Sequence, residues 1–308
     1  MHRRSLFALL ASSVVWSGCG PTPKPDPDPT GSDTGTATQT TSTSTTTQDT
    51  DTTTQTTATG TTTGTTATGG TGSGTIDTGG WACGDPVDYD NHPYATTLIG
   101  TQCWFAENLR TTVYADGSVI VANLFGANFG FATSGATIVY GEGDPANGDP
   151  CSHDSPLIDA CDSTQSLAEY GRLYNWHAVD DPRGLCPPGW HVPSDGEWTV
   201  LNDYVAAQGF AGMEGTALQT TTGWAEVTPG VTGNGTDDFG FAIKPSGLRA
   251  TGGSGHIEAG NETRLWSSDP NGDYAFFRKV RKGGALLEPL SVGKVQGNAV
   301  RCLQDAPP

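Results

Sequence analysis

Positive charge is scarce in this sequence. The chain carries 15 lysine and arginine residues against 33 aspartate and glutamate residues, a formal net charge of −18. Proteins that bind nucleic acid need a basic surface to neutralise phosphates. The basic segment FRKVRKGG, residues 277–284, lies in an otherwise acidic domain. We expect it to pair with acidic loops of the same fold, and the composition argues against a nucleic-acid partner.

Common enzyme signatures and long apolar runs are also missing. After the first 20 residues, no apolar run is long enough to cross a bilayer as a helix. The patterns G-x-S-x-G and H-E-x-x-H do not occur. None of the seven cysteines belongs to a C-x-x-C pair, which disfavours thioredoxin-like chemistry and a zinc knuckle. These absences favour a protein that is not an enzyme.

The first residues have the order of an export signal. Two arginines precede a short apolar run at residues 6–16, and small residues then lead to Cys19. This order resembles the lipobox of bacterial lipoproteins, in which the cysteine is acylated and becomes the mature N-terminus. Valine and tryptophan stand where a leucine is usual. A plain secretory signal, in which Cys19 is incidental, is the alternative.

The lipobox interpretation predicts where the protein is found. We expect residues 1–18 to be removed as a signal peptide and Cys19 to carry a lipid that anchors the chain to a membrane. An aspartate after the cysteine would resemble an inner-membrane retention signal, whereas this chain has Gly20. The expected location is therefore the outer membrane, with the protein displayed at the cell surface.

Residues 19–80 have the composition of a disordered tether. A proline-rich start, PTPKPDPDPT, is followed by a tract in which 26 of residues 30–78 are threonine. Ile76 is the only large apolar side chain in that tract. Because so little apolar surface is available, burial does not offset the entropy lost on ordering. We expect this segment to hold a folded domain away from the membrane.

Residues 81–308 have the composition of one loop-rich α+β domain. Aromatic residues suffice for a core, glycine is abundant, and helical periodicity is scarce. Six cysteines in an exported chain predict three disulfides, although spacing alone leaves the pairing open. The first two expected pairs close short loops and the third closes a long one: Cys83–Cys103, Cys151–Cys161 and Cys186–Cys302.

The stretch GLCPPGWHVPSDGEW, residues 184–198, predicts an extended lead-in and a helix. Ser194 is followed three residues later by Glu197, which is a capping box. Apolar residues then recur at helical spacing, and Gly209 is a helix stop. We expect a helix over 195–208. Before it, Trp190 and Val192 are expected to alternate into the core.

The same stretch contains residues of types used in catalysis. Asp195 and Glu197 form a carboxylate pair, and His191 is a possible ligand type. The capping box accounts for Glu197, and an acidic residue in the first helical turn complements the helix dipole. No second histidine lies near His191 at metal spacing. We therefore interpret the stretch as structural.

Other strands are predicted from short alternating segments between turns. Residues 96–118 suggest a strand pair with a turn at Asp116-Gly117. Residues 170–179, YGRLYNWHAV, suggest one strand with alternating aromatics. Short strands separated by glycine-rich loops are expected at 239–250, 265–269, 274–281 and 298–305.

Several of these segments carry a family resemblance. In chain order they are IGTQCWFAENLRT, YGRLYNWHAV, GLCPPGWHVPSDGEW, PSGLRATGG, LWSS and GNAVRCLQD. They resemble the Fibrobacter succinogenes major paralogous domain family over residues 96–305. That family occurs on exported bacterial proteins and lipoproteins, and the resemblance implies no established activity.

The order of elements is also similar to C-type-lectin-like domains. Cys186, the helix at 195–208, the strand of Trp266 and Cys302 fit that plan. Sugar-binding members carry an EPN- or QPD-type calcium tripeptide, which this chain lacks. Formylglycine-generating enzymes share the fold and use a reactive cysteine pair that binds copper. Here every domain cysteine has an expected disulfide partner, which leaves no cysteine pair for that chemistry. A shared fold does not by itself imply a shared activity.

Calcium is the one metal for which the sequence offers candidate ligands. Asp269, Asn271 and Asp273 in DPNGD alternate oxygen ligands around a glycine, as calcium loops do. The glutamate that completes an EF-hand is missing, and an ordinary turn between strands is the alternative. Asp237-Asp238 is a second candidate of the same kind. Apart from calcium, we expect no cofactor.

These observations predict a surface-tethered lipoprotein whose domain binds or adheres without catalysis. The expected ligand is a glycan or a cell-surface protein. The alternatives are an oxidoreductase of the formylglycine-generating kind and a purely structural envelope protein. Loops at 123–165 and 209–236 are the expected binding surface, since loops on a rigid scaffold commonly carry function.

Overall fold

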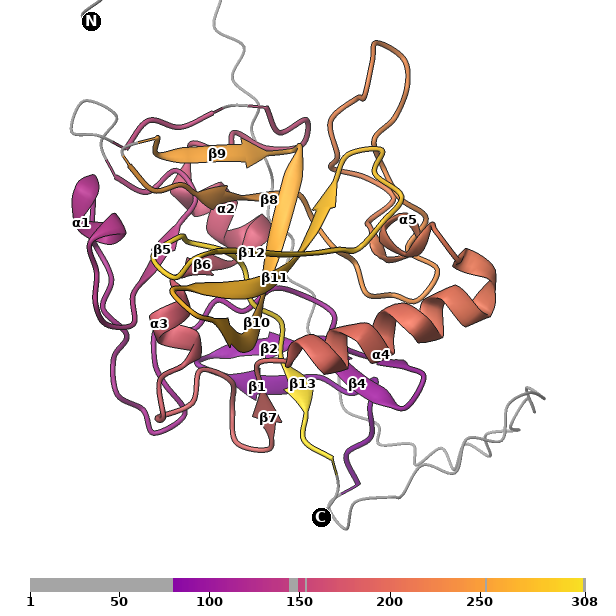
Figure 1. The fold of residues 1–308 in the computed structure, drawn as a ribbon, viewed down its shortest axis with the longest axis horizontal. Coiled ribbons are helices and arrows are strands. Elements are labelled where there is room, and N and C mark those ends of the chain that lie inside the picture. The colour runs from indigo at the N-terminus through magenta and orange to yellow at the C-terminus, as the bar shows by residue number, and fades with distance from the viewer. Residues whose placement is uncertain (1–79, 144–148, 153, 253, 307–308) are drawn as a thin grey trace, which may run out of the picture. The chain divides into compact units, whose positions relative to one another are not determined.

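The computed structural model describes residues 80–143, 149–152, 154–252 and 254–306 (Figure 1). The expected signal peptide, Cys19 and the tether up to residue 79 lie outside the described residues. None of the described helices is long and apolar enough to cross a membrane.

The domain begins with four strands and ends with six, and short helices alternate with strands between them. The helices are α1 (Ala127–Gly130), α2 (Ser163–Tyr170), α3 (Trp176–Val179), α4 (Asp195–Val205) and α5 (Glu214–Leu218). The strands of the first half are β1 (Val87–Tyr89), β2 (His92–Tyr94), β3 (Thr96–Ile99), β4 (Gln102–Phe105), β5 (Thr137–Val139), β6 (Arg172–Tyr174) and β7 (Trp190–His191). Those of the second half are β8 (Ser246–Arg249), β9 (His256–Ala259), β10 (Glu262–Asn271), β11 (Tyr274–Arg281), β12 (Glu288–Gly293) and β13 (Leu303–Gln304).

The strands form several small sheets rather than one large one. A five-stranded sheet has the order β12-β11-β10-β8-β9, and a four-stranded sheet has the order β3-β4-β13-β7. Two further sheets are the pairs β1-β2 and β5-β6. The last strand, β13, therefore lies between β4 and β7, and the beginning and end of the domain share one sheet (Figure 1). The architecture is mixed α+β and loop-rich.

Helix α4 begins where the capping box predicts. The Ser194 side chain accepts a hydrogen bond from the Glu197 amide, and the Glu197 carboxylate accepts one from the Ser194 amide. The α-helix ends at Val205 rather than at 208. The chain continues in a wider turn over Ala206–Phe210, within which Gly209, at a φ of +103°, breaks the helical conformation.

The prediction of one strand over 170–179 is wrong. Tyr170 ends helix α2, which Asp162 caps by accepting from two backbone amides. Gly171, with a φ of +75°, turns the chain into strand β6, and Asn175 then caps the short helix α3. The aromatic alternation is real but spans two helices and a strand, because polar caps override the period-two pattern.

Five tryptophans of the described residues are buried in the core: Trp104, Trp176, Trp198, Trp224 and Trp266. Trp104 and Trp198 pack with ring centroids 4.8 Å apart in one core cluster. Trp176 and Trp266 belong to the second cluster and donate their indole N–H groups to buried carbonyls. Buried indole N–H groups usually find an acceptor, and these two bonds fix the orientation of the Trp176 and Trp266 rings. The buried Trp104 N–H has no partner among the described residues.

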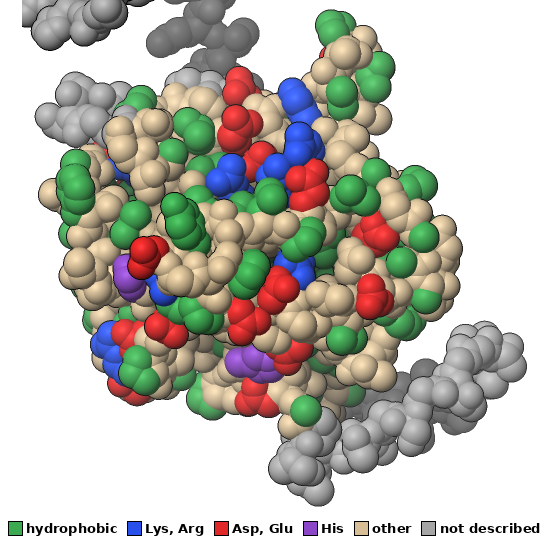
Figure 2. Space-filling model, in the orientation of Figure 1, with side chains coloured by type: hydrophobic (Ala, Val, Ile, Leu, Met, Phe, Trp, Pro, Cys, Tyr) green, Lys and Arg blue, Asp and Glu red, His purple; other side chains and the backbone are tan. Residues whose placement is uncertain are grey.

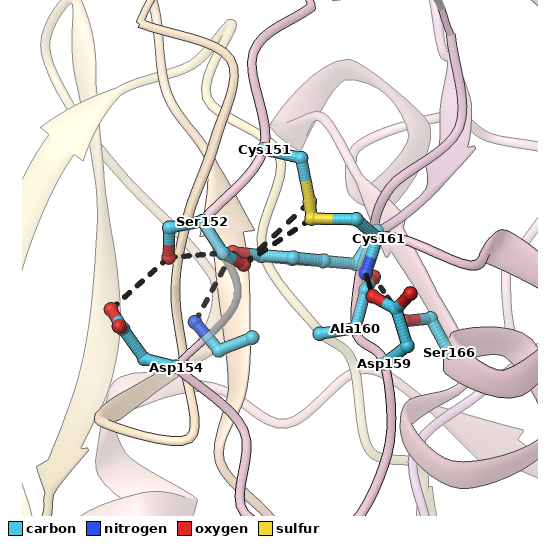
Figure 3. Close-up of a disulfide and its surroundings, with 9 residues drawn as sticks. Cys151, Ser152, Asp154, Asp159, Ala160, Cys161 and Ser166 are labelled. Atoms are coloured by element: carbon cyan, nitrogen blue, oxygen red, sulfur yellow. Dashed lines mark hydrogen bonds between the residues drawn. A yellow bond between two sulfur atoms is a disulfide. The ribbon is translucent and has the colours of Figure 1, made fainter. Parts of the chain in front are cut away.

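The disulfides are Cys83–Cys103, Cys151–Cys161 and Cys186–Cys302, the same pairing as expected from the sequence. Figure 3 shows the second of these beside the start of α2. The Ser152 carbonyl oxygen lies 3.6 and 3.5 Å from its two sulfurs. Close by, Ser166 donates to the carbonyl of Ala160, so the loop before α2 is fixed to the helix.

Several of the basic residues late in the chain are paired with acidic ones. Two partners come from earlier in the chain, although they lie on helices and not in the expected loops: Arg278 contacts Asp195 of α4, and Lys244 contacts Glu169 of α2 at 3.0 Å. Others lie on the same sheet, where Glu288 on β12 pairs with residues of β11. Figure 2 shows basic side chains beside acidic ones on this face. The basic segment is thus balanced within the fold.

His256 on β9 is a buried histidine without a hydrogen-bond partner on either ring nitrogen among the described residues. Its ring lies against Tyr140, with centroids 5.2 Å apart. Burial and the nearby charge of Arg249 lower the pKa of His256 to about 3. The side chain is therefore neutral in the folded state across the ordinary pH range.

We expect this histidine to weaken the fold in acid. Below pH 6.5 an exposed histidine in the unfolded chain binds a proton that folded His256 refuses, so stability falls by up to about 1.4 kcal/mol per pH unit. The variant His256→Leu should lose that part of the slope. Denaturant unfolding of the parent and the variant at pH 6.5 and 4.5 measures this slope. Between these two pH values the parent should lose about 2 kcal/mol more unfolding free energy than the variant. Equal slopes would contradict the assignment.

Candidate functional site

The three candidate calcium ligands lie at the hairpin between β10 and β11. Asp269 accepts a hydrogen bond from the Asp195 amide at 2.7 Å, so one of its oxygens caps helix α4. The Asn271 amide donates to Ser291 at 3.2 Å, and Asp273 lies in the turn beside Gly272, whose φ is +63°. This is the Asx/Gly turn given as the alternative, and the calcium site stays a prediction.

The second acidic pair is also engaged in local structure. Asp237 accepts from the Ala242 amide at 2.8 Å, and Asp238 accepts from Thr236. Burial raises the pKa of Asp237. Among the residues described, no group of three or more His, Cys, Asp or Glu side chains is placed to hold a metal ion.

His191 on β7 lies between two carboxylates. Its Nδ1 is 2.6 Å from Asp305, and its Nε2 is 3.0 Å from Glu197. Burial opposes ionisation of Glu197, but hydrogen bonds from Ser194 and the interaction with His191 outweigh it and lower the pKa of Glu197. The histidine thus joins the C-terminal segment to the first turn of α4.

This arrangement does not provide a catalytic base. A cavity of about 240 Å³ adjoins His191, and Ser268 is among its lining residues. A serine hydrolase needs the free ring nitrogen of its histidine to accept the serine proton. Here both ring nitrogens face carboxylates, and none of the described hydrogen bonds joins Ser268 to His191. The contacts are those of a structural clamp.

A second hollow, on the other side of Trp190, is the better candidate for a binding site. We call it the Trp81/Trp190 groove. Its volume is about 370 Å³. Its lining combines two tryptophans, apolar residues and two polar side chains: Trp81, Pro86, Val87, Asp88, Pro188, Gly189, Trp190 and Gln304.

One wall of the groove is set by a tight turn. The Trp190 amide donates to the Pro187 carbonyl at 3.0 Å, and Gly189 has a φ of +83°. Proline at the second position and glycine with positive φ at the third define a type II turn. The Asp305 amide also donates to the Gly189 carbonyl at 2.9 Å. The turn therefore fixes Trp190 beside β13, where it pairs with Gln304.

The opposite wall comes from the start of the described chain. The Trp81 indole donates to the Pro86 carbonyl at 3.3 Å, and the turn between them is closed by Asp85, which accepts from the Ala82 amide. The Cys83–Cys103 disulfide attaches this turn to β4. Asp88 is the exposed central residue of the short strand β1 that follows.

A row of aromatic rings supports the groove from below. Trp81 meets Trp190 edge-on at a centroid distance of 5.9 Å, and Trp190 rests against Phe105 at 4.7 Å. Phe105 in turn stacks on the buried Tyr94 at 4.7 Å. Such contacts add to the stability of each ring beyond its buried area. Trp190 is therefore held in place while one of its surfaces faces solvent.

Sequence reasoning missed this site. Val192 is buried, as predicted, but Trp190 is only partly buried and lines two hollows. Trp81 stands immediately after the low-complexity tract, where the sequence indicates only the start of the domain. The loops expected to bind, 123–165 and 209–236, do expose apolar side chains such as Phe131 and Val231. They contribute no residue to either hollow.

The structure is a disulfide-stabilised α+β domain, and its three disulfides indicate an extracytoplasmic protein, since disulfides form and persist mainly in oxidising compartments. The chain belongs to the Fibrobacter succinogenes major domain family, whose model matches residues 98–304. The family resemblance found in the sequence is thereby confirmed. The search of curated proteins and the search of solved structures each gave no match.

Proposed function

We propose that this protein is an exported lipoprotein whose C-terminal domain is a binding or adhesion module without catalytic activity. The observation that carries the proposal is the Trp81/Trp190 groove, which offers aromatic surface and free polar groups but no nucleophile paired with a base. Binding sites of this kind are concave and largely preformed, with few polar groups that fix the ligand. The proposal includes no nucleic-acid partner.

A C-type-lectin-like arrangement is part of the same proposal. Strands β3 and β4, near the start of the domain, share a sheet with the last strand, β13, and Cys302 next to β13 is bonded to Cys186 ahead of α4. Both features agree with the lectin-like plan. The formylglycine-generating alternative needs reactive thiols, and all six cysteines of the described residues are in disulfides. A structural envelope role would leave the groove without a ligand.

The lipid anchor at Cys19 is tested by the substitution Cys19→Ala. Acylation attaches the chain to the membrane through this side chain, so the variant should move from the membrane pellet to the soluble fraction. The matched control is Ser17→Ala, which keeps the cysteine and should still pellet. Fractionation after high-salt washing measures the result. A Cys19→Ala protein that still pellets would refute the anchor.

The binding proposal is tested with the purified full-length chain. It should bind to envelope fractions or to extracellular polysaccharide, and protease treatment and glycosidase treatment of the fractions separate protein from glycan ligands. The measurement is made with calcium and again with a chelator, which tests the calcium prediction at the same time. Failure to bind any of these materials would favour a structural envelope role.

A further inference from the structure

We infer that the Trp81/Trp190 groove binds a neutral saccharide, over one or two sugar rings, without calcium. The inference rests on the proposed binding function and names its ligand class and residues. It follows from the size of the groove, its unpartnered polar groups, its charge and its position in the chain.

The size of the groove suits a short part of a ligand. Its volume, about 370 Å³, is near the lower end of the range for small-molecule sites, roughly 300–1,000 Å³. The groove is open to solvent rather than enclosed. An open groove lets a longer chain extend beyond the site at both ends, as a polysaccharide requires. It does not favour a compact ligand that must be surrounded.

The two indoles supply the apolar part of recognition. One face of a pyranose ring carries aligned C–H groups, and such a face packs on the negative face of an aromatic ring. The ring planes of Trp81 and Trp190 meet at 85°, so the two indoles are nearly perpendicular. They therefore form a corner, in which one indole stacks under a ring and the other borders it.

The polar groups of the groove are free to bind. The Asp88 carboxylate, the Gln304 amide and the Trp190 indole N–H have no partner among the residues that the structure describes. Together they offer acceptors and donors around one small hollow. A ligand with several neighbouring hydroxyl groups satisfies all three, because each hydroxyl both donates and accepts.

The charge of the lining excludes other small ligands. No lysine or arginine lines the groove, and Asp88 repels anions, so acidic sugars and phosphates are disfavoured. A quaternary ammonium would interact with the indoles and Asp88, as cations do with aromatic rings. It makes no hydrogen bonds, however, and would leave Gln304 and the indole N–H unpartnered. A neutral polyhydroxy ligand uses the whole site.

The groove combines two parts of the chain. Trp190 and Gln304 lie within the family segment 98–304, whereas Trp81 and Asp88 precede it. The family domain thus provides one wall, and the residues between the tether and that domain provide the other. Ligand choice therefore depends on residues outside the matched family segment as well as on residues within it.

The test measures binding of neutral oligosaccharides to the purified full-length chain. The probes are oligomers of glucose, xylose, mannose and galactose, two to six sugars long. Their binding is measured by calorimetry and by tryptophan fluorescence in the presence of EDTA. Asp88→Ala should weaken binding at least about tenfold, because a hydrogen bond to a charged group is lost. Trp190→Ala should abolish it. Asp203→Ala, which removes an equally exposed carboxylate on α4, should change nothing.

The outcomes separate this inference from the proposed function. Trp190 packs on Phe105, so near-ultraviolet circular dichroism must show that the Trp190 variant is folded; Asp88→Ala and Gln304→Ala test the groove without that risk. Saccharide binding that is unchanged in both surface variants overturns the groove assignment but keeps the binding function. Binding of choline or of a protein, with no saccharide bound, overturns the ligand class. No binding to oligosaccharides or to envelope fractions overturns both.

Discussion

Replacing both cysteines of the third disulfide, in the variant C186A/C302A, is expected to lower the free energy of unfolding by about 5 kcal/mol. The bond joins residues separated by 116 positions, so its loss frees a long loop in the unfolded chain. It also releases the lead-in to β7 from the segment before β13. Chemical denaturation of the full-length chain, monitored by tryptophan fluorescence, measures the change.

The matched control is C151A/C161A, which opens a loop of only 10 positions. The same chain-entropy relation gives a loss of about 2.7 kcal/mol for this pair. Removing the disulfide that closes the long loop should therefore lower the free energy of unfolding by about 2 kcal/mol more than removing the one that closes the short loop. Equal losses in the two variants would show that local packing around each bond, and not loop entropy, sets the contribution.

The second large effect is expected at Arg301, which is fully buried. Its guanidinium donates to the side chain of Asn108 at 3.0 Å and to the carbonyls of Phe241 and Ala242, and it lies over the Phe241 ring at 4.6 Å. Burial lowers the pKa of Arg301, which still carries its charge at neutral pH. Arg301→Met should lower the free energy of unfolding by about 3–5 kcal/mol, because several buried acceptors lose their donor.

Two further variants make this expectation specific. Arg301→Lys keeps the charge but loses the planar fork of donors, so it should recover only part of the stability. Arg183→Met, at an arginine on the surface that pairs with Asp181, should change stability little. Urea unfolding of the three variants gives the comparison. An Arg301→Met protein as stable as the parent would mean that the buried carbonyls find other donors.

Local signals explain what the sequence predicts correctly. The capping box at Ser194 and Glu197 involves residues three positions apart, so no tertiary information is needed to place the start of α4. The expected pairing of Cys186 with Cys302 also agrees with the structure, although the spacing of the cysteines alone leaves the pairing open. The strand at 274–281 has the predicted bounds, because turns lie at both ends.

Other features depend on partners that are distant in the sequence. The aromatic character of Trp190 predicts burial, but its exposed surface follows from the position of Trp81, more than 100 residues earlier. Nothing local distinguishes Arg301 or His256 from surface residues of the same kind. Both become buried through segments that are distant in sequence: β13, next to Arg301, pairs with β4, and His256 lies against Tyr140 and bridges to Cys151. The groove is for the same reason invisible in sequence.

The first disulfide has a mechanical consequence. The chain that precedes Gly80 enters the domain through Trp81 and Ala82, and Cys83 is already bonded to Cys103 on β4. Tension applied from the N-terminal side therefore passes from Cys83 through a covalent bond into the middle of the domain. Only the residues ahead of Cys83 are left to move. If the domain is anchored on its N-terminal side and binds a ligand in the groove, as we propose, tension would displace Trp81 first and would weaken binding before the domain unfolds.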